Sequence, residues 1–593
     1  MTSDRRTIRR LAGAGVLGAA VLLAWAGPVR ADPIVATPHI HDIRGGGLTS
    51  PLDGKQVSQV PGIVTAITTN GFWAQDPQPD GSDATSEGIF VFTGTAPAVA
   101  VGDQVQVYGT VNDFRPGGPS SPGLTRTEID ATSATVGAHG LPLPPPVVIG
   151  THGRRPPTDT IAHGITFYRS LEGMRVAVDD AVAIGPRTAD GEVPVLADNG
   201  ARQGVRTSRG GIALQAQTAN PERIIMGGAL APIPAVNVGD VFPGRSTGIL
   251  DYGSGNFKLL LTAIPQVALG SPPRQYARIA APGELSVATA NLHDLDPSDP
   301  PAKFQGVALE IVGNLAAPDL VAVQEVEDNS GPQNDGTVAA DQTVAQLIAA
   351  ISAADGPAYQ WRSIDPQNNA DGGEPGGNVR SGFLFRTDRG LSFVDRPGGD
   401  ATTPVIAVDD GTGHARLSIS PGRLDPANPA WTDSRKPLAG EFTWNGRRLI
   451  VIADHWNSKS GDDPLFGASQ PPRAQSEPQR IAEAQVVAGF VKSVQAVEKD
   501  ALVIVAGDLN DVEYSPALKA LTDGTGLRDL PAGLAVPDRY TYLYEGNSEV
   551  LDHLLLSPAL TRVPHEYQIV HMNAEYADQV SDHDPSLVRL TLG

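Results

Sequence analysis

The sequence predicts a multidomain chain in which an all-β N-terminal part precedes an α/β C-terminal part. The chain has 593 residues, which corresponds to about three to four domains of ~100–200 residues each. In the first half, glycine and proline separate many short strand-like segments, as in small all-β domains. In the second half, short apolar segments alternate with helix-like stretches, which is the layout of an α/β domain.

Residues 1–31 have the pattern of a secretory signal peptide. Arginines at four of positions 5–10 precede an apolar stretch over 11–25, and a small-residue cleavage site at 29–31 follows. The apolar stretch is shorter than the ~20 residues of a transmembrane helix, although a membrane anchor is the alternative. We therefore expect a secreted chain, extracellular, cell-surface or periplasmic, without a transmembrane segment after cleavage. The paired arginines also permit twin-arginine export, and the sequence leaves the route open.

Composition limits the chemistry that the chain can perform. There are no cysteines, so the fold uses no disulfides and no thiolate acts as nucleophile or metal ligand. The formal net charge is −22, whereas affinity for phosphates comes from neutralising them with lysine and arginine. A nucleic-acid enzyme of this composition therefore needs a local basic groove, a bound metal ion, or both.

The region 33–145 is expected to be a small β-barrel or sandwich. Strand-like segments occur at 62–68, 71–76, 88–92 and 101–109, and Val105 and Val107 alternate there with polar residues. The aromatic residues Phe72, Trp73 and Tyr108 either fill the core of this domain or stack on bases.

The region 146–272 is predicted to be a second β domain of related design. Its segment 172–176 resembles 53–57, and Val238-Gly-Asp240 repeats Val101-Gly-Asp103.

The region 277–593 is predicted to be an α/β domain. Apolar strands at 285–290, 320–323, 449–453 and 502–506 alternate with helical stretches at 343–350 and 476–491. Polar side chains follow or precede these strands repeatedly, and a sheet would bring them to one edge. They are Asn291, Glu325, His455, Asp508, Asn510, Asp552, Asp582 and His583.

Such a group of side chains suits the hydrolysis of phosphodiesters. Carboxylate and amide oxygens suit Mg²⁺ or Mn²⁺. A metal ion polarises the phosphoryl oxygen, and an imidazole with a pKa near neutrality can activate water.

Seven short motifs occur in order along this region. They are Ala290-Asn-Leu292, Gln324-Glu-Val-Glu327, residues 377–384 (GNVRSGFL), residues 454–459 (DHWNSK) with 461–463 (GDD), Gly507-Asp-Leu-Asn510, residues 551–555 (LDHLL) and residues 581–585 (SDHDP). In this order the motifs resemble the endonuclease/exonuclease/phosphatase superfamily, which includes pancreatic-type DNase, abasic-site endonucleases, sphingomyelinases and inositol-polyphosphate phosphatases. More narrowly, the chain resembles large bacterial extracellular nucleases of that superfamily, and the region 33–145 resembles their oligonucleotide/oligosaccharide-binding (OB) barrels.

The resemblance implies a four-layer α/β sandwich for 277–593 and a role for each motif residue. Glu325 is implied as the principal metal ligand, helped by Asn291 and Asp582. His583 is implied as the general base, oriented by Asp552. The implied roles of the others are positioning of the nucleophile or the leaving-group proton by Asp508, and donation to phosphate by Asn510, His455 and Arg380.

Further residues are candidates for the rim of this site. Asn457 and Lys459 are candidate phosphate contacts, although relatives often have lysine at the position of Asn457, and Asp454 and Trp456 also depart from the family pattern. Asp462 and Asp463 either hold Ca²⁺ or a second metal ion, or are solvated loop residues. His571 and Asn573 either shape the site or end a strand. A basic groove or surface ion pairs can be formed by Arg435, Lys436, Lys459, Arg473 and Arg480.

Three functions fit this pattern to different degrees. The first is a secreted metal-dependent nuclease that cuts DNA, with RNA as a further substrate. No motif in the sequence indicates a protein partner. The second is a phosphodiesterase or phosphatase that acts on lipid or small phosphoesters, but no aromatic-rich apolar hairpin for membrane insertion is evident. The third is a binding protein with a decayed enzyme domain, and the presence of Glu325, Asp508 and His583 argues against it.

Overall fold

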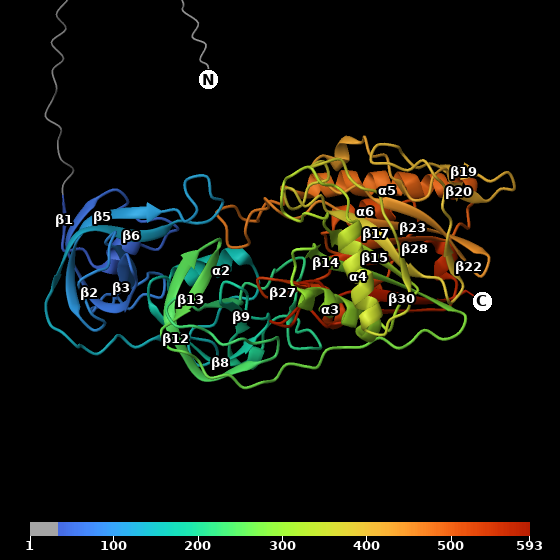
Figure 1. The fold of residues 1–593 in the computed structure, drawn as a ribbon. Coiled ribbons are helices and arrows are strands. Elements are labelled where there is room, and N and C mark those ends of the chain that lie inside the picture. The colour runs from blue at the N-terminus through green and yellow to red at the C-terminus, as the bar shows by residue number, and fades with distance from the viewer. Residues whose placement is uncertain (1–33, 593) are drawn as a thin grey trace, which may run out of the picture.

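The computed structural model describes residues 34–592, and the predicted signal peptide lies outside them. Figure 1 shows a mostly β architecture in which two small barrels precede a larger domain that carries the long helices. Within the described residues, no helix is both long and apolar enough to cross a membrane.

The first barrel closes because its first strand pairs with two neighbours. The strand order is β2-β3-β4-β6-β5, and β5 pairs back with β2. Phe72 and Trp73 are buried in this part of the chain, so they fill cores, whereas Tyr108 is half-buried. The elements are β1 (Val35–Ala36), α1 (Ile40–Arg44), β2 (Gln56–Ile67), β3 (Gly71–Gln75), β4 (Gly88–Phe92), β5 (Gln104–Phe114) and β6 (Arg126–Val136).

The second barrel closes in the same way. Its order is β8-β9-β11-β13-β12, with β12 paired back to β8. A core of residues such as Tyr168, Val178 and Phe257 fills it. The elements are β7 (Val147–Ile149), α2 (Ile161–Arg169), β8 (Arg175–Ala183), β9 (Glu192–Leu196), η1 (Asp198–Gly200), β10 (Ile212–Ala213), β11 (Ile224–Gly227), β12 (Val241–Gly253) and β13 (Asn256–Leu261).

The two barrels have the same strand topology. In each, the third and fifth barrel strands pair in parallel, β4 with β6 and β11 with β13. The repeated Val-Gly-Asp segments precede the fourth strand of each barrel. There Asp103 accepts a hydrogen bond from the Ala100 amide (2.8 Å), and Asp240 accepts the equivalent bond from the Asn237 amide (2.9 Å). The short sequence repeats therefore mark equivalent turns of two barrels with the same topology.

The C-terminal domain contains two sheets that pack face to face. The strand order of one sheet is β16-β17-β15-β14-β30-β29, and that of the other is β18-β22-β23-β24-β28-β25 with β21 beside β22. The strands are β14 (Glu284–Leu295), β15 (Leu320–Val326), β16 (Tyr359–Arg362), β17 (Arg380–Arg386), β18 (Leu391–Phe393), β19 (Ala407–Asp409), β20 (Ala415–Leu417), β21 (Gly422–Arg423), β22 (Leu438–Trp444), β23 (Arg447–His455), β24 (Val503–Asp508), β25 (Arg528–Asp529), β26 (Tyr542–Tyr544), β27 (Asn547–Glu549), β28 (Asp552–Leu556), β29 (His565–Ile569) and β30 (Ser586–Thr591).

Helices cover the outer faces of these sheets. One core joins Val287 and Phe383 of the first sheet to Val451 and Ile504 of the second. The outer face of the first sheet packs on α3 and α4, and that of the second packs on α5 and α6. The helices are α3 (Pro301–Leu309), η2 (Glu310–Asn314), α4 (Asp341–Ala353), η3 (Pro429–Trp431), α5 (Glu477–Val497), α6 (Pro516–Thr522), η4 (Pro531–Gly533), η5 (Val536–Asp538) and α7 (Pro558–Thr561).

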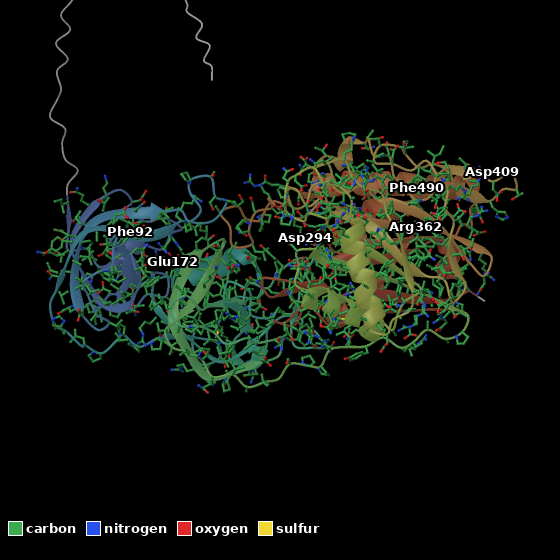
Figure 2. The ribbon with its side chains drawn as sticks, in the orientation of Figure 1. Phe92, Glu172, Asp294, Arg362, Asp409 and Phe490 are labelled. Carbon is green, nitrogen blue, oxygen red and sulfur yellow. The ribbon has the colours of Figure 1, made fainter. Side chains whose placement is uncertain are left out.

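Contacts also join the three parts of the chain. The barrels meet at a buried ion pair between Arg44 and Glu172 (3.1 Å), and Figure 2 shows Glu172 at this junction. A small sheet of order β10-β27-β26 combines one strand of the second barrel with a hairpin of the C-terminal domain. The second barrel is therefore continuous, through backbone hydrogen bonds, with the domain that follows it.

Candidate active site

The predicted polar residues meet at one edge of the two facing sheets. Because β23 and β24 run parallel, His455 pairs in register with Asp508. Because β28 is antiparallel to β24, its first residue, Asp552, pairs with Asp508 as well. In the other sheet, Asn291 of β14 pairs with Gln324 of β15, one residue before Glu325. The strand register thus places side chains from distant parts of the chain beside one another.

His583 is held by a buried carboxylate. Its Nδ1 lies 2.7 Å from Asp552 Oδ2, and its Nε2 lies 3.8 Å from Asp508 Oδ2. An ionised carboxylate only accepts hydrogen bonds, so the Asp552 contact assigns the proton to Nδ1 and leaves the Nε2 lone pair directed at the site. This is the arrangement that a general base requires.

Glu325, His455 and Asp508 form a second group at the same edge, close enough for one atom of each to hold a metal ion. His455 Nε2 lies 3.8 Å from Glu325 Oε1 and 3.6 Å from Asp508 Oδ2. Asn291 Nδ2 donates to Asp508 Oδ2 at 3.3 Å. Carboxylate oxygens with an imidazole and a neighbouring amide are a donor set that fits a divalent cation.

Burial and charge shift the pKa values of these groups. Burial raises the pKa of Asp508 to about 6. Burial opposes protonation of His583, but the carboxylates of Asp552 and Asp508 outweigh it and raise its pKa well above 6.5. Burial lowers the pKa of His455 well below 6.5, and Arg435 adds to this effect. His455 is therefore neutral near pH 7, and it can act there as a ligand or as a neutral donor.

Backbone conformation also marks this edge. Glu325 has φ 56° and Asn510 has φ 50°, in the left-handed region that residues other than glycine seldom adopt. The Asn510 amide donates to Asp508 Oδ1 (2.9 Å), and its side-chain amide donates to the Trp456 carbonyl (3.0 Å). Left-handed conformations of this kind concentrate at functional sites.

The two departures from the family pattern beside His455 form a buried pair. Trp456 Nε1 donates to Asp454 Oδ2 at 2.9 Å, and neither side chain is exposed. Burial raises the pKa of Asp454 to about 8. These residues support the strand end from behind, on the side away from the cleft.

The edge of the sheets opens into a cleft of about 940 Å³. Of the residues predicted from the sequence, those that line it are Glu325, Arg435, His455, Asn457, Lys459, Asp462, Asp463, Arg473, Arg480, Asp508, Asn510, Asp582 and His583. Asn291 and Asp552 lie behind this surface and contact it through Asp508 and His583.

The structure does not bring Arg380 to the cleft. Its guanidinium is buried, lies 2.5 Å from Asp365 Oδ1 and donates to the Asn378 carbonyl. The preceding residue, Val379, lines the cleft instead, because successive side chains of an extended segment point to opposite sides. In place of the predicted contact with phosphate, Arg380 forms an ion pair with Asp365.

His571 and Asn573 support the loop that carries His583 from outside the cleft. His571 Nδ1 bonds to Asp584 Oδ2 (2.9 Å), and its ring stacks on Tyr540 at 4.1 Å. Asn573 Nδ2 donates to the His583 carbonyl (3.1 Å).

Most charged residues at the rim are already paired. Asp582 Oδ1 bonds to His293 (3.0 Å), and Lys459 pairs with Glu549 (2.6 Å). Asp462 accepts bonds from Ser476, whereas Asp463 pairs with Arg473 (2.9 Å). The predicted groove cations have internal partners too: Arg435 donates to the Trp456 carbonyl, Lys436 pairs with Asp371, and Arg480 pairs with Asp511. The cleft is consequently not a free basic groove.

Sequence analysis missed an aromatic hairpin at the cleft. The Tyr542 ring of β26 lies 4.8 Å from the His583 ring, and Tyr544 is 49% exposed. Both line the cleft, as does Asp294, which the sequence did not single out either. The only signal in the sequence was the alternation of tyrosines at 540, 542 and 544, which indicates a strand but not its location.

His553 faces away from the site, and its protonation should make the stability of the fold depend on pH. Its Nδ1 bonds to Asp529 (2.9 Å) and its Nε2 to the Asp511 carbonyl (2.9 Å). Burial opposes protonation, but Asp529 outweighs it and raises the pKa of His553 to about 9.

Because the folded pKa of His553 lies above the unfolded value, its stabilisation is complete below about pH 6.5 and disappears as the pH rises through about 9. Between pH 6 and 9.5 we expect the free energy of unfolding of the wild type to fall by about 3 kcal/mol through this group, and we expect His553→Gln to lack this loss. Urea titrations of the wild type and of His553→Gln at pH 6 and pH 9.5 measure the two free energies of unfolding. Equal losses in both proteins would show that His553 does not titrate as described.

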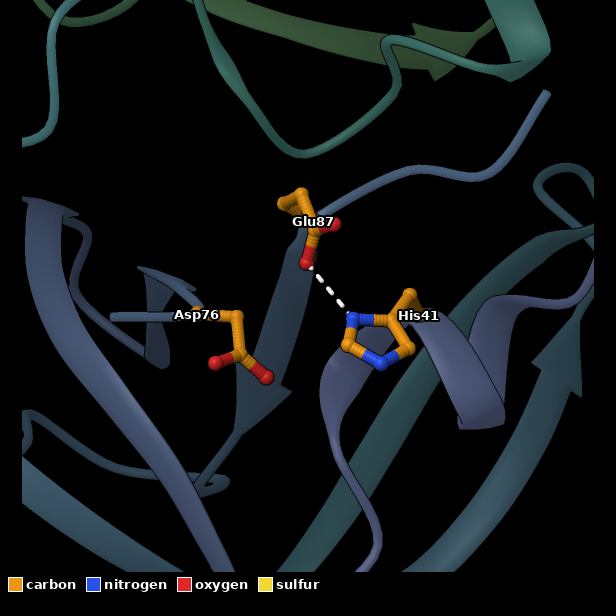
Figure 3. Close-up of side chains that lie close together, drawn as sticks. All are labelled: His41, Asp76 and Glu87. Carbon is orange, nitrogen blue, oxygen red and sulfur yellow. Dashed lines mark hydrogen bonds and ion pairs between the residues drawn. The ribbon is translucent and has the colours of Figure 1, made fainter. Parts of the chain in front are cut away.

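A separate histidine–carboxylate cluster lies in the first barrel (Figure 3). His41 Nδ1 bonds to Glu87 Oε2 at 2.9 Å, and Asp76 is nearby. Both carboxylates also accept hydrogen bonds from backbone amides. Asp76 accepts from the Ile40 amide, and Glu87 accepts from the Asp80 amide. These bonds fasten α1 to the β3–β4 loop.

Two protein-family models match parts of the chain. The Endonuclease/Exonuclease/phosphatase family model matches residues 288–583, and a domain of unknown function, DUF8508, matches residues 148–269. No curated protein matches the chain.

Several solved structures are similar to about half of the chain. The endonuclease/exonuclease/phosphatase from Bacteroides vulgatus is 15% identical over 52% of this chain and 99% of its own, with a TM-score of 0.34. The mannosyl-6-phosphatase Bt3783 of Bacteroides thetaiotaomicron is 17% identical over 52% and 99%, with a TM-score of 0.33. D. rerio TDP2 complexed with single strand DNA product is 17% identical over 52% and 98%, with a TM-score of 0.33.

The matched family is hydrolytic and acts on phosphoester bonds, and its enzymes generally depend on a divalent metal ion. The matched residues include the whole group around Glu325, His455, Asp508 and His583. Residues 288–583 of this chain therefore form a domain of the endonuclease/exonuclease/phosphatase family.

Proposed function

We propose that the protein is a secreted, divalent-metal-dependent nuclease that hydrolyses phosphodiester bonds of DNA. One observation carries the proposal: His583, oriented by Asp552, shares one sheet edge with Glu325, His455 and Asp508 at the base of a large cleft. This combines an imidazole base with a cation-binding group, which are the two requirements of phosphodiester hydrolysis by water.

The residues of the chain have distinct roles in the proposed reaction. His583 Nε2 accepts a proton from the attacking water, while Asp552 holds Nδ1 and stabilises the imidazolium. Asp508 lies 3.8 Å from His583 Nε2 and orients the water. The neutral His455 and the Asn510 side chain, which line the cleft, donate to the phosphate oxygens and offset the negative charge that develops there. Water attacks phosphorus, the bond to the leaving oxygen breaks, and that oxygen takes up a proton.

The proposed metal ion is Mg²⁺ or Mn²⁺. Glu325 and Asp508 would hold it, with Asn291 beside them, and His455 Nε2 lies 3.8 and 3.6 Å from the two carboxylates. A bound divalent ion supplies Lewis-acid polarisation of the phosphoryl oxygen. Asp582, whose carboxylate bonds to His293, completes the acidic wall of the site.

Two features support a polymeric substrate and an extracellular location. The first barrel has five strands in a closed order with a parallel pair between the third and fifth, which supports the OB interpretation and a role in binding single strands. The pattern of residues 1–31 supports secretion.

The test is cleavage of supercoiled plasmid by the purified chain with Mg²⁺ or Mn²⁺, with a chelator added to parallel samples. We expect nicking followed by degradation, no cleavage with the chelator, and recovery when excess Mg²⁺ is returned. Absence of cleavage of plasmid, linear DNA and RNA with every divalent ion would reject the nuclease proposal. Release of phosphate from lipid or sugar phosphates would then assign the site to small phosphoesters.

A further inference from the structure

One wall of the cleft is a hairpin that the second barrel holds in place. The hairpin consists of β26 and β27, and β10 of the barrel pairs in parallel with β27. Asn220 Nδ2 of the barrel donates to Asn547 Oδ1 at 2.9 Å, and both residues are buried. The Arg223 guanidinium donates to the carbonyl of Glu545, at the turn of the hairpin. Main-chain and side-chain bonds therefore set the position of this wall from outside the catalytic domain.

The opposite wall, residues 457–475, is anchored in the barrel as well. Phe466 is 1% exposed and belongs to the hydrophobic core of the barrel. Its ring meets Tyr168 and Phe257 edge to face, each at 5.9 Å. The Tyr252 hydroxyl donates to the Phe466 carbonyl at 2.9 Å. A loop of the catalytic domain thus supplies a core residue to the barrel, so the loop cannot move independently of it.

An ion pair joins the two walls. Lys459 of one wall pairs with Glu549 of the other at 2.6 Å. Leu214, which belongs to the barrel itself, lines the cleft and donates its amide to the Ser548 carbonyl (2.9 Å). Figure 2 shows Asp294, another residue of the cleft, on the side of the catalytic domain that faces the barrel. The barrel therefore contributes both the support of the walls and part of their surface.

We propose that the barrel of residues 148–269, which matches a domain of unknown function, is the substrate-positioning part of this active site. It fixes the position of both walls and presents Leu214 in the same cleft as Tyr544. The sugars and bases of a polynucleotide rest on these side chains while one phosphate faces His583. This inference depends on the proposed nuclease function. Binding energy from such remote contacts orients a long substrate over the reacting groups. A small phosphodiester reaches only the part of the walls next to His583, such as Tyr542, and therefore gains little from Leu214 and the rest of them.

Two variants of the full chain test this. Phe466→Ala releases one wall, and Leu214→Ala removes the contact that the barrel itself makes. Their matched controls are Ile264→Ala and Leu269→Ala, at exposed positions that follow the last strand of the second barrel. For each protein, KM and kcat are measured on a DNA oligonucleotide, and the rate is measured on bis(p-nitrophenyl) phosphate. Amide hydrogen exchange reports whether 457–475 and 540–549 open while β14 stays protected.

For both variants we expect KM for the oligonucleotide to rise roughly tenfold, with little change in kcat and in the rate on the small ester. The controls should match the wild type. An unchanged KM in both variants overturns the proposal. Equal fractional losses on both substrates also overturn it, because they show that the barrel only stabilises the fold. If the wild type cleaves the small ester but not DNA, the nuclease function is rejected, and the same comparison on the largest phosphoester that it cleaves decides the role of the barrel.

Discussion

His583→Ala is expected to lower the rate of phosphodiester hydrolysis by about 10²–10⁴-fold, the usual contribution of a general base. The reason is geometric, since Asp552 holds Nδ1 and leaves Nε2 as the only ring atom that can take a proton from water. The rate of the wild type should also rise with pH, because neighbouring carboxylates raise the pKa of His583 and only the neutral ring accepts a proton. In the variant, this rising limb of the pH profile should disappear.

Plasmid nicking at a series of pH values measures both effects. His414→Ala is a suitable control, because His414 forms an exposed pair with Glu498 in the same domain and does not line the cleft. A variant that retained the rate and the pH profile of the wild type would remove His583 from the mechanism. Thermal unfolding of each protein shows whether a loss of rate reflects a loss of fold.

Glu325→Gln should reduce hydrolysis roughly a thousandfold at limiting metal concentration, since a metal ion contributes several kcal/mol to transition-state stabilisation. Glu325 lies 3.8 Å from His455 and belongs to the group that can hold a cation. Glutamine keeps the size of the side chain and removes the charge that attracts a dication. More Mg²⁺ or Mn²⁺ should therefore be needed for half-maximal activity.

Titration of activity with each ion checks this expectation, and Glu374→Gln is the matched control. Glu374 lines the same cleft but is not a member of the group with His455 and Asp508. It should need the same concentration of metal as the wild type. If both variants shift alike, the general negative charge of the cleft, and not a site at Glu325, attracts the ion.

The candidate catalytic residues of the C-terminal domain were predictable because short local sequence patterns identify them. Each catalytic candidate stands at the end of an apolar segment, and the ends of neighbouring strands meet at one edge of a sheet. Asp508 and Asp552 illustrate this, since they are 44 positions apart and pair in register. The partner of a side chain is less predictable. Arg380 pairs with Asp365 and does not reach the cleft, because this depends on which face of the strand Arg380 occupies.

The sequence by itself determined that two β-rich regions of related design precede an α/β domain, and that carboxylates, amides and imidazoles collect at strand ends. Periodicity and turn residues carry this information within a few positions of the chain. Only the tertiary structure decided that Phe466 enters the core of the second barrel and that β10 pairs with β27. These contacts join residues hundreds of positions apart, and no local pattern specifies them, because they depend on how whole domains fit together.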